Sequence, residues 1–272
     1  MKVYISVDIE GVAGICDWKE TELGDSSYAP FQIQMTKETA SCIEGLKAAG
    51  VEEIYVRDAH DSARNLILSE LPKGIKIIRG WENHPCDMLA GLDESFDACL
   101  FIGYHSPARS KENPLSHTMN LGHNHLLLNG KPMSEFHINA YYANSLNVPV
   151  IMVSGDRGLC DLVKQENQEI LTVSTKEGLH GAVISKHPDD VCEEIKAATI
   201  EAVNKLKKES NNKPKFFLSL EKPVEAEIFF RKTKQAHLAS FYPGTRIVKD
   251  DIVAYTGKDI WDVLTFLLFT DK

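Results

Sequence analysis

Two carboxylates follow the first apolar run of the chain. In the stretch ISVDIEGVAG, residues 5–14, Asp8 and Glu10 come just before breaks at Gly11 and Gly14. On a strand, residues two apart point to the same face, so the two acids would lie side by side. Such carboxylates repel each other, and a bound cation is a common reason to keep them together. The motif alone is compatible with a solvated turn, a phosphatase nucleophile with its acid partner, or a metal site.

Two further apolar runs end on residues of similar chemistry. VRDAH ends one run with Asp58 and His60, and FIGYH ends another with His105. Open α/β sheets bind ligands beyond the carboxyl ends of their strands, so these side chains and Asp8 are expected at one edge. A lone histidine at a strand end is usually structural, but three such ends together favour a metal. Imidazole with carboxylate suits Zn²⁺ better than Mn²⁺ or Fe²⁺. A carboxylate between two ions about 3.5–4 Å apart would make a hydrolytic centre.

Other candidates follow later in the chain. His117 lies in LSHTMN, and Glu135 and His137 lie in PMSEFHINA. Glu135 opens a predicted helix, where an acidic residue needs no functional explanation. His123 and His125 flank a predicted hairpin, which favours a structural or solvated role. The sequence contains neither a GxxxxGK[ST] loop nor GxGxxG after a strand, so a nucleotide would lack its phosphate-binding loop.

Short apolar runs that alternate with amphipathic segments must position these residues. This alternation predicts an α/β fold, a three-layer sandwich with a mostly parallel central sheet. The run ACLFIGY is apolar throughout, as in a strand buried on both faces. The predicted strands cover 3–9, 52–58, 75–80, 98–104 and 148–155, and the predicted helices cover 35–49, 134–144 and 187–209.

The rest of the chain is less regular. Residues 116–133 contain an Asn129-Gly130 pair, a hairpin signal, and predict a β-ribbon that protrudes from the main sheet. The linker-like SNNKPK at 210–215 divides the chain into a predicted catalytic domain, 1–210, and a smaller C-terminal α+β subdomain or extension, 211–272. In that extension the sequence predicts a strand at 224–232, a helix at 234–242, a strand at 246–257 and a helix at 259–269.

Composition limits the possible partners and location. The net charge of −9 argues against nucleic acid or an anionic membrane as the main partner. The N-terminus carries acids by residue 8 and does not resemble a signal peptide, and no apolar run approaches the length of about 20 residues that a bilayer requires. The six cysteines are scattered singly, and Cys42, Cys99 and Cys192 fit buried thiols. We therefore expect a cytoplasmic protein.

Five separated motifs resemble those of a known family. SVDIEG at 6–11 fits the SxDxEG key sequence of the M55 peptidase family of D-aminopeptidases. The resemblance continues in order with RDAH at 57–60, GYH at 103–105, SHTM at 116–119 and SEFHINAY at 134–141. It covers most of residues 1–156, while the C-terminal third is similar in layout, down to a PGT turn at 243–245.

The resemblance implies an aminopeptidase with two Zn²⁺ ions per chain. Asp8 would bridge both ions, Glu10 and His105 would complete the ligands of one, and His60 and Glu135 those of the other.

Two further residues receive roles from the same resemblance. His117 would transfer protons or stabilise the tetrahedral intermediate, and Asp58 would fix the tautomer of His60. His123 and His137 lie outside the family motif.

The resemblance also implies a substrate and an assembly. Short peptides with an N-terminal D-amino acid would be hydrolysed inside a homodecamer of two stacked five-membered rings. The ribbon at 117–130 would be a contact element of that assembly.

Two other functions compete with this interpretation. The first is a haloacid-dehalogenase-like, magnesium-dependent phosphatase, because DIEGV at 8–12 weakly resembles the DxDGT motif of those enzymes. It requires a second aspartate where Glu10 stands, and it has no use for His60 or His105. A metal-sensing or receiver-like module would also carry acids at strand ends, but receivers are usually about half this length and lack such histidines.

Overall fold

A seven-stranded sheet forms the centre of the protein. The computed structural model describes residues 1–209 and 212–270, so Ser210 and Asn211 of the predicted linker lie outside the described residues. Neighbouring strands are parallel except for β9, which is antiparallel to β8. The strands, in spatial order, are β3 (Lys76–Ile78), β2 (Glu53–Asp58), β1 (Lys2–Val7), β4 (Ala98–Tyr104), β7 (Val150–Asp156), β8 (Leu171–Leu179) and β9 (Ala182–Ser185).

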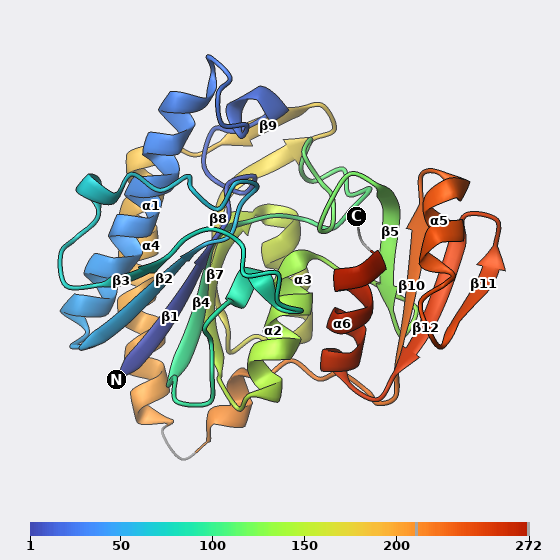
Figure 1. The fold of residues 1–272 in the computed structure, drawn as a ribbon. Helices are drawn as coiled ribbons and strands as arrows, with labels where there is room; N and C mark the ends of the chain where they lie inside the picture. Colours follow the sequence, from blue (N-terminus) through green and yellow to red (C-terminus); the bar gives the residue numbers. More distant parts are fainter. Residues whose placement is uncertain (210–211, 271–272) are drawn as a thin grey trace.

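Helices cover both faces of this sheet (Figure 1). On one face α1 (Tyr28–Ala48) and α4 (Pro188–Lys208) pack on side chains such as Ile5 and Leu100. On the other face, α2 (Glu135–Ser145) and α3 (Arg157–Glu166) pack on the sheet. Helix α6 (Ile260–Thr270) packs on α2, within the core that also includes Tyr4 and Phe101. Every residue of β4 is buried, as its unbroken apolar run predicts. The predicted three-layer α/β sandwich is confirmed.

Helix α1 begins earlier than its predicted start at Met35. It starts at Tyr28, and Pro30 lies in its first turn, where backbone N–H groups have no intrahelical acceptor. Exposed or polar residues occupy most of these first turns, so the apolar periodicity that marks the rest of the helix does not reach them. The predicted stop at Gly50 is confirmed, since this glycine adopts a φ of +76° directly after the helix.

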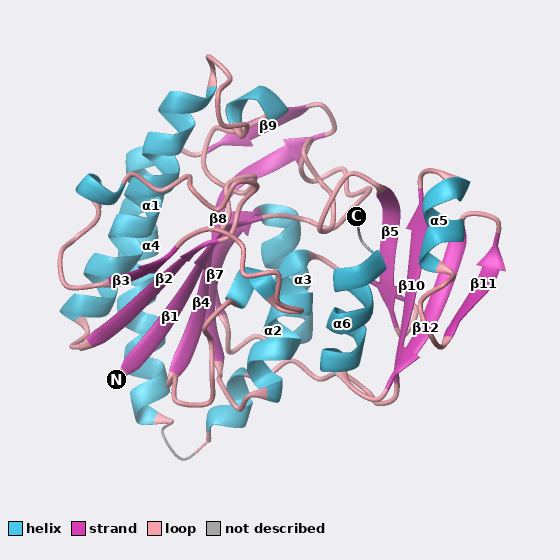
Figure 2. Ribbon diagram, in the orientation of Figure 1, coloured by secondary structure: helices cyan, strands magenta, loops and turns pink. Residues whose placement is uncertain are grey.

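A second, antiparallel sheet lies beyond α6 (Figure 2). The predicted ribbon forms β5 and β6 around Asn129-Gly130, and β5 pairs with β10, a contact that the sequence did not predict. The segment 246–257 forms two strands rather than the predicted one. In spatial order the strands are β11 (Thr245–Lys249), β12 (Ile252–Gly257), β10 (Val224–Phe230), β5 (His123–Leu128) and β6 (Lys131–Pro132).

Strand β10 shows why this sheet packs on the rest of the protein. Its buried and half-buried residues alternate, and Ile228 and Phe230 point into the core that Phe136 and Phe266 also share. A short helix, α5 (Thr233–Ala239), also packs on β10. The domain boundary near residue 210 stays a prediction. Within 1–209 and 212–270, no helix is both long and apolar enough to cross a membrane.

Candidate metal centre

Asp8 and Glu10 lie just beyond the strand that leads to them. β1 ends at Val7, so the expected placement of both acids on one face of a strand is wrong. The loop is pressed against β4 instead: the Gly11 N–H donates to the Gly103 carbonyl at 2.8 Å, and a Cβ on Gly11 would lie 1.7 Å from the Tyr104 oxygen. Only glycine permits this close approach, which turns both carboxylates toward the neighbouring strand ends.

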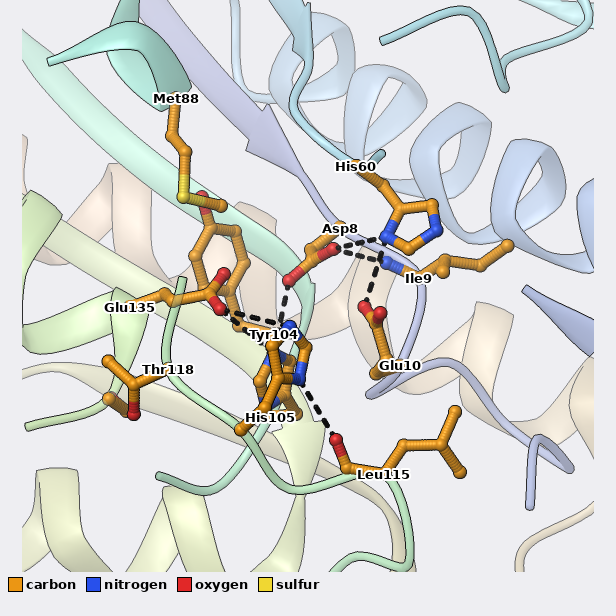
Figure 3. A network of polar contacts seen from close by, with 12 residues as sticks. Asp8, Ile9, Glu10, His60, Met88, Tyr104, His105, Leu115, Thr118 and Glu135 are labelled. Carbon is orange, nitrogen blue, oxygen red and sulfur yellow. Dashed lines mark hydrogen bonds and ion pairs between the residues drawn. The ribbon is translucent and has the colours of Figure 1, made fainter. Parts of the chain in front are cut away.

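Asp8 lies between two imidazole rings, with one oxygen facing each (Figure 3). Its Oδ1 is 3.3 Å from His60 Nδ1, and its Oδ2 is 3.6 Å from His105 Nε2. His60 Nδ1 is also 3.2 Å from Glu10 Oε2, and His105 Nε2 is 3.5 Å from Glu135 Oε1. The shortest contacts thus pair Glu10 with His60 and Glu135 with His105, which is the reverse of the pairing that the resemblance implied.

His117 completes the group. Its ring stacks on His105 at a centroid distance of 4.4 Å, and its Nε2 lies 3.3 Å from Glu135 Oε1. Its Nδ1 is 2.9 Å from the Leu115 carbonyl, so a neutral ring donates there and leaves Nε2 able to accept a proton. Ligand atoms of His105, His117 and Glu135 all lie within 4.8 Å of one another, as do those of Asp8, Glu10 and His105.

Backbone carbonyls orient the two histidines that face Asp8. The outer nitrogen of His60, Nε2, is 3.0 Å from the Thr21 carbonyl. The outer nitrogen of His105, Nδ1, is 2.9 Å from the Ser106 carbonyl. When each outer nitrogen donates a proton, the inner nitrogen carries a free lone pair toward Asp8. This is the tautomer that a metal ligand requires.

Asp58 has different partners from those expected. Its carboxylate accepts hydrogen bonds from the backbone N–H groups of Asn65 and Leu66 at 2.5 and 2.8 Å, and from the Asn65 amide at 2.9 Å. The same amide donates to the His60 carbonyl at 2.7 Å. Asp58 therefore holds the loop that carries His60, while the Thr21 carbonyl contacts the ring.

The charges of the centre perturb one another strongly. Burial, and then the Glu10 carboxylate, raise the pKa of Asp8 to about 8. Burial opposes ionisation of Glu10 too, but His60 outweighs it and holds the Glu10 pKa well below its usual range. Burial lowers the pKa of His105, yet Glu135 and Asp8 raise it to about 10, and the Glu10 carboxylate likewise holds the His60 pKa well above its ordinary value. Protons thus neutralise this acidic group, a task that bound cations perform equally well.

Several atoms of the centre need such a cation. Asp8 Oδ2, Glu10 Oε2 and His105 Nε2 are buried and make no hydrogen bond within the described part of the chain. A buried polar atom without a partner costs about 1–3 kcal/mol, so three of them in one group require an explanation. Carboxylate oxygens and imidazole nitrogens that converge on the same space fit a divalent transition metal, and zinc in particular.

Comparison of the sequence with known proteins assigns the chain to a family. The model of the M55 peptidases, described as D-aminopeptidase, matches residues 1–269. The chain belongs to the M55 family of D-aminopeptidases. It is 31% identical over 270 residues to the D-aminopeptidase of Bacillus subtilis (strain 168), covering 98% of this chain and 96% of that protein.

A solved structure agrees with this assignment. The Zn-dependent D-aminopeptidase DppA from Bacillus subtilis, a self-compartmentalizing protease, superposes with a TM-score of 0.89 at 30% identity and covers 100% of this chain and 97% of that one. The present chain is therefore a peptide hydrolase of the metallo-aminopeptidase type.

In this M55 protein, side chains of β8 hold the loop at residues 8–15, the metal loop, which carries Asp8 and Glu10. The sequence alone did not predict this set of contacts, the clamp. The Lys176 ammonium, which is buried, donates to the carbonyls of Glu10 and Ile15, both at 2.6 Å. The Asn113 amide donates to the same Glu10 carbonyl at 3.0 Å, and the Thr175 hydroxyl donates to the Gly11 carbonyl at 2.6 Å. No local pattern marks these residues, because each acts on a loop more than a hundred positions away.

The first turn of α2 fixes Glu135. Ser134 caps the helix by accepting from the backbone N–H of His137 at 3.3 Å, and its hydroxyl also lies 2.7 Å from His137 Nδ1. Burial lowers the pKa of His137 to about 4, so the ring is neutral. His137 therefore supports the helix cap. His123 and His125 lie on β5, where their rings pack against Phe230 and Phe229.

Proposed function

We propose that this chain is a zinc-dependent aminopeptidase that hydrolyses short peptides with an N-terminal D-amino acid. The observation that carries the proposal is the position of Asp8 between His60 and His105, each of which also faces a second buried carboxylate. The relatives named above, a D-aminopeptidase and a Zn-dependent D-aminopeptidase, support both the metal and the substrate.

Two ions per chain fit this arrangement. Asp8 Oδ1, Glu10 and His60 Nδ1 would hold one zinc, and Asp8 Oδ2, His105 Nε2 and Glu135 would hold the other. When bound, the ions would polarise the scissile carbonyl and lower the pKa of a water molecule so that it attacks at neutral pH.

His117 is the residue that we assign to proton transfer. Burial and the neighbouring His105 lower its pKa, so the ring is neutral and Nε2 accepts a proton at neutral pH. The Leu115 carbonyl fixes the ring from the other side. His117 would take a proton as the water attacks and deliver it to the departing amine.

The assembly and the location are also proposals. The related structure is a self-compartmentalizing protease, which supports a homo-oligomer, and we propose the decamer of two five-membered rings. On the predicted extension, 211–272, the exposed apolar side chains of Leu238, Phe241 and Ile247 suit contacts between subunits. All six cysteines are free thiols, which favours the cytoplasm.

The test compares Asp8→Ala with Asp190→Ala, an exposed aspartate on α4. Zinc content and hydrolysis of D-Ala and L-Ala dipeptides are measured with and without chelator. We expect native protein and Asp190→Ala to hold two zinc ions and cleave D-Ala-D-Ala, and Asp8→Ala to lose both properties. A zinc-loaded native protein that cleaves neither set of peptides would contradict the proposal, as would a magnesium-dependent phosphatase activity.

A further inference from the structure

Large apolar side chains line the cavity beside the metal centre. This cavity, of about 430 Å³, is lined in part by Asp8, Glu10, His60, His117 and Glu135. Its other walls include Trp18, Trp81, Met88, Met119 and Leu121. Trp81, Met119 and Leu121 are 38%, 36% and 45% exposed, an unusual concentration of apolar surface next to a polar centre. Such surface in a concave site is typical of a wall that a ligand covers.

Trp81 is held rigidly in this wall. The buried guanidinium of Arg57 lies 4.6 Å from the centre of its ring, a cation–π contact. Arg57 also donates to the carbonyls of Gly80 and Asp87 at 2.5 and 3.0 Å. The indole N–H of Trp81 donates to the Asp61 carbonyl at 2.6 Å. A fixed aromatic surface of this kind loses little entropy when a ligand packs against it.

Two other residues of the lining, Met119 and Trp18, contact the metal centre directly. The backbone N–H of Met119 donates to Glu135 Oε1 at 2.7 Å. Met119 adopts a φ of +69°, a left-handed conformation that is rare for a residue other than glycine. Such a conformation persists where the surroundings enforce it, often at ligand sites. Trp18 packs edge-on against His117 at 5.3 Å. This part of the apolar lining therefore contacts the groups that would act on the scissile bond.

The charges of the cavity disfavour anions. Apart from the metal centre, its ionisable lining residues are Glu22, Asp61 and Asp87, all acidic, and its described lining includes neither lysine nor arginine. The Asp87 carboxylate accepts hydrogen bonds from the backbone N–H groups of Glu82 and Asn83 at 3.0 and 2.8 Å. An acidic side chain packed against Glu22, Asp61 and Asp87 would be repelled by these three carboxylates.

We propose that Trp81, Met119 and Leu121 form the subsite for a large apolar side chain on a substrate residue that flanks the scissile bond. The protein would thus prefer peptides with a bulky apolar residue to those with alanine, and reject acidic side chains. This inference rests on the proposed aminopeptidase function and specifies its substrate class. Apolar pockets of this kind discriminate by about 10- to 200-fold.

The test uses the zinc-loaded protein and two peptide series, D-Xaa-D-Ala and D-Ala-D-Xaa, where Xaa is Phe, Ala or Glu. In at least one series kcat/KM should be about tenfold higher for Phe than for Ala, and lower still for Glu. Trp81→Ala should remove most of the Phe preference and keep the zinc content, so that kcat/KM falls more for the Phe peptides than for D-Ala-D-Ala. Trp81→Phe should restore the preference. Trp261→Ala, an exposed tryptophan outside the cavity lining, is the matched control.

Binding separates failure of the subsite from failure of the proposed function. D-Phe and D-Ala hydroxamates, which bind zinc directly, are compared by calorimetry on the same variants, with Leu121→Ala as a second variant if Trp81→Ala does not fold. The native protein should bind the D-Phe compound more tightly than the D-Ala compound, and Trp81→Ala or Leu121→Ala should weaken that binding. The same result in a protein that cleaves no peptide would support the subsite and refute the peptidase function. Equal Phe and Ala values in the native protein, or a Phe preference that these variants leave unchanged, would overturn the subsite.

Discussion

Replacing Lys176 by methionine tests how the metal loop is held. The buried Lys176 ammonium donates to the carbonyls of Glu10 and Ile15 at 2.6 Å, and Glu10 is a proposed zinc ligand. Methionine fills a similar volume without a donor or a charge. The substitution therefore frees the loop while it leaves the carboxylates and imidazoles of the centre in the chain.

Two opposing effects set the change in stability. Losing a hydrogen bond from a charged donor costs about 1.5–3 kcal/mol, or about 3–6 kcal/mol for the two, although the Glu10 carbonyl keeps its hydrogen bond from the Asn113 amide. Burial lowers the pKa of Lys176 from 10.5 to about 8. Burial outweighs the attraction of Asp156, Glu38 and Glu10, so the charged ammonium carries a net penalty of about 3 kcal/mol in the folded protein, which methionine escapes. The free energy of unfolding should therefore fall by no more than about 3 kcal/mol, which leaves most of a typical stability of about 5–15 kcal/mol.

Lys176→Met should also lower the affinity for zinc. Loss of a group that orients a metal ligand typically lowers affinity by about 10- to 100-fold. Because Lys176 holds the backbone of Glu10, the zinc shared by Glu10 and His60 should weaken, while the zinc at His105 and Glu135 should be retained. We expect Lys176→Met to lose about one zinc per chain to a competing chelator under conditions where native protein keeps two.

The assays are chelator competition and urea unfolding of the metal-free protein. Lys164→Met is the matched control, since Lys164 also donates to two carbonyls, those of Gln168 and Ile170, at 3.0 and 2.6 Å. It should change stability without changing zinc affinity. Zinc binding in Lys176→Met within twofold of the native protein, while unfolding shows a loss of stability, would refute the reasoning that the clamp positions Glu10.

Three further predictions concern other groups. Burial raises the pKa of Glu38 from 4.5 to about 7, so the folded state keeps a proton that the unfolded state releases, and stability should fall as pH rises from 4.5 to 7. In urea unfolding across this pH range, the free energy of unfolding of Glu38→Gln should depend less on pH and exceed that of the native protein by up to about 3 kcal/mol at pH 8. An unchanged pH dependence would contradict this. Ser134→Ala should remove the α2 cap and lower the free energy of unfolding by about 1 kcal/mol. It should also reduce kcat, because the cap positions Glu135, whereas Ser134→Thr should retain the native stability and kcat. His117→Gln should keep both zinc ions by metal analysis and lose about 10²–10⁴ in kcat; loss of zinc instead would make His117 a ligand.

Local sequence patterns were enough to predict the central fold. The unbroken apolar run of β4 and the periodic, well-capped α4 specify their structure within their own residues. Where the signal was not local, prediction failed. The first turns of α1 are mostly exposed and carry no apolar periodicity, and β5 gains its partner β10 only through a pairing across about a hundred residues. Such long-range pairing leaves no periodicity in either segment.

The sequence by itself determined that Asp8, Glu10, His60 and His105 gather at one edge, because parallel strands bring their carboxyl ends together. Only the tertiary structure decided which carboxylate faces which imidazole, since a spacing along the chain says nothing of distances between loops. It also decided that the Thr21 carbonyl, rather than Asp58, contacts the ring of His60. The same holds for larger features, the Lys176 clamp and the Trp81 wall. They arise where segments far apart in the chain pack together, and side-chain contacts of that kind are fixed by the folded geometry alone.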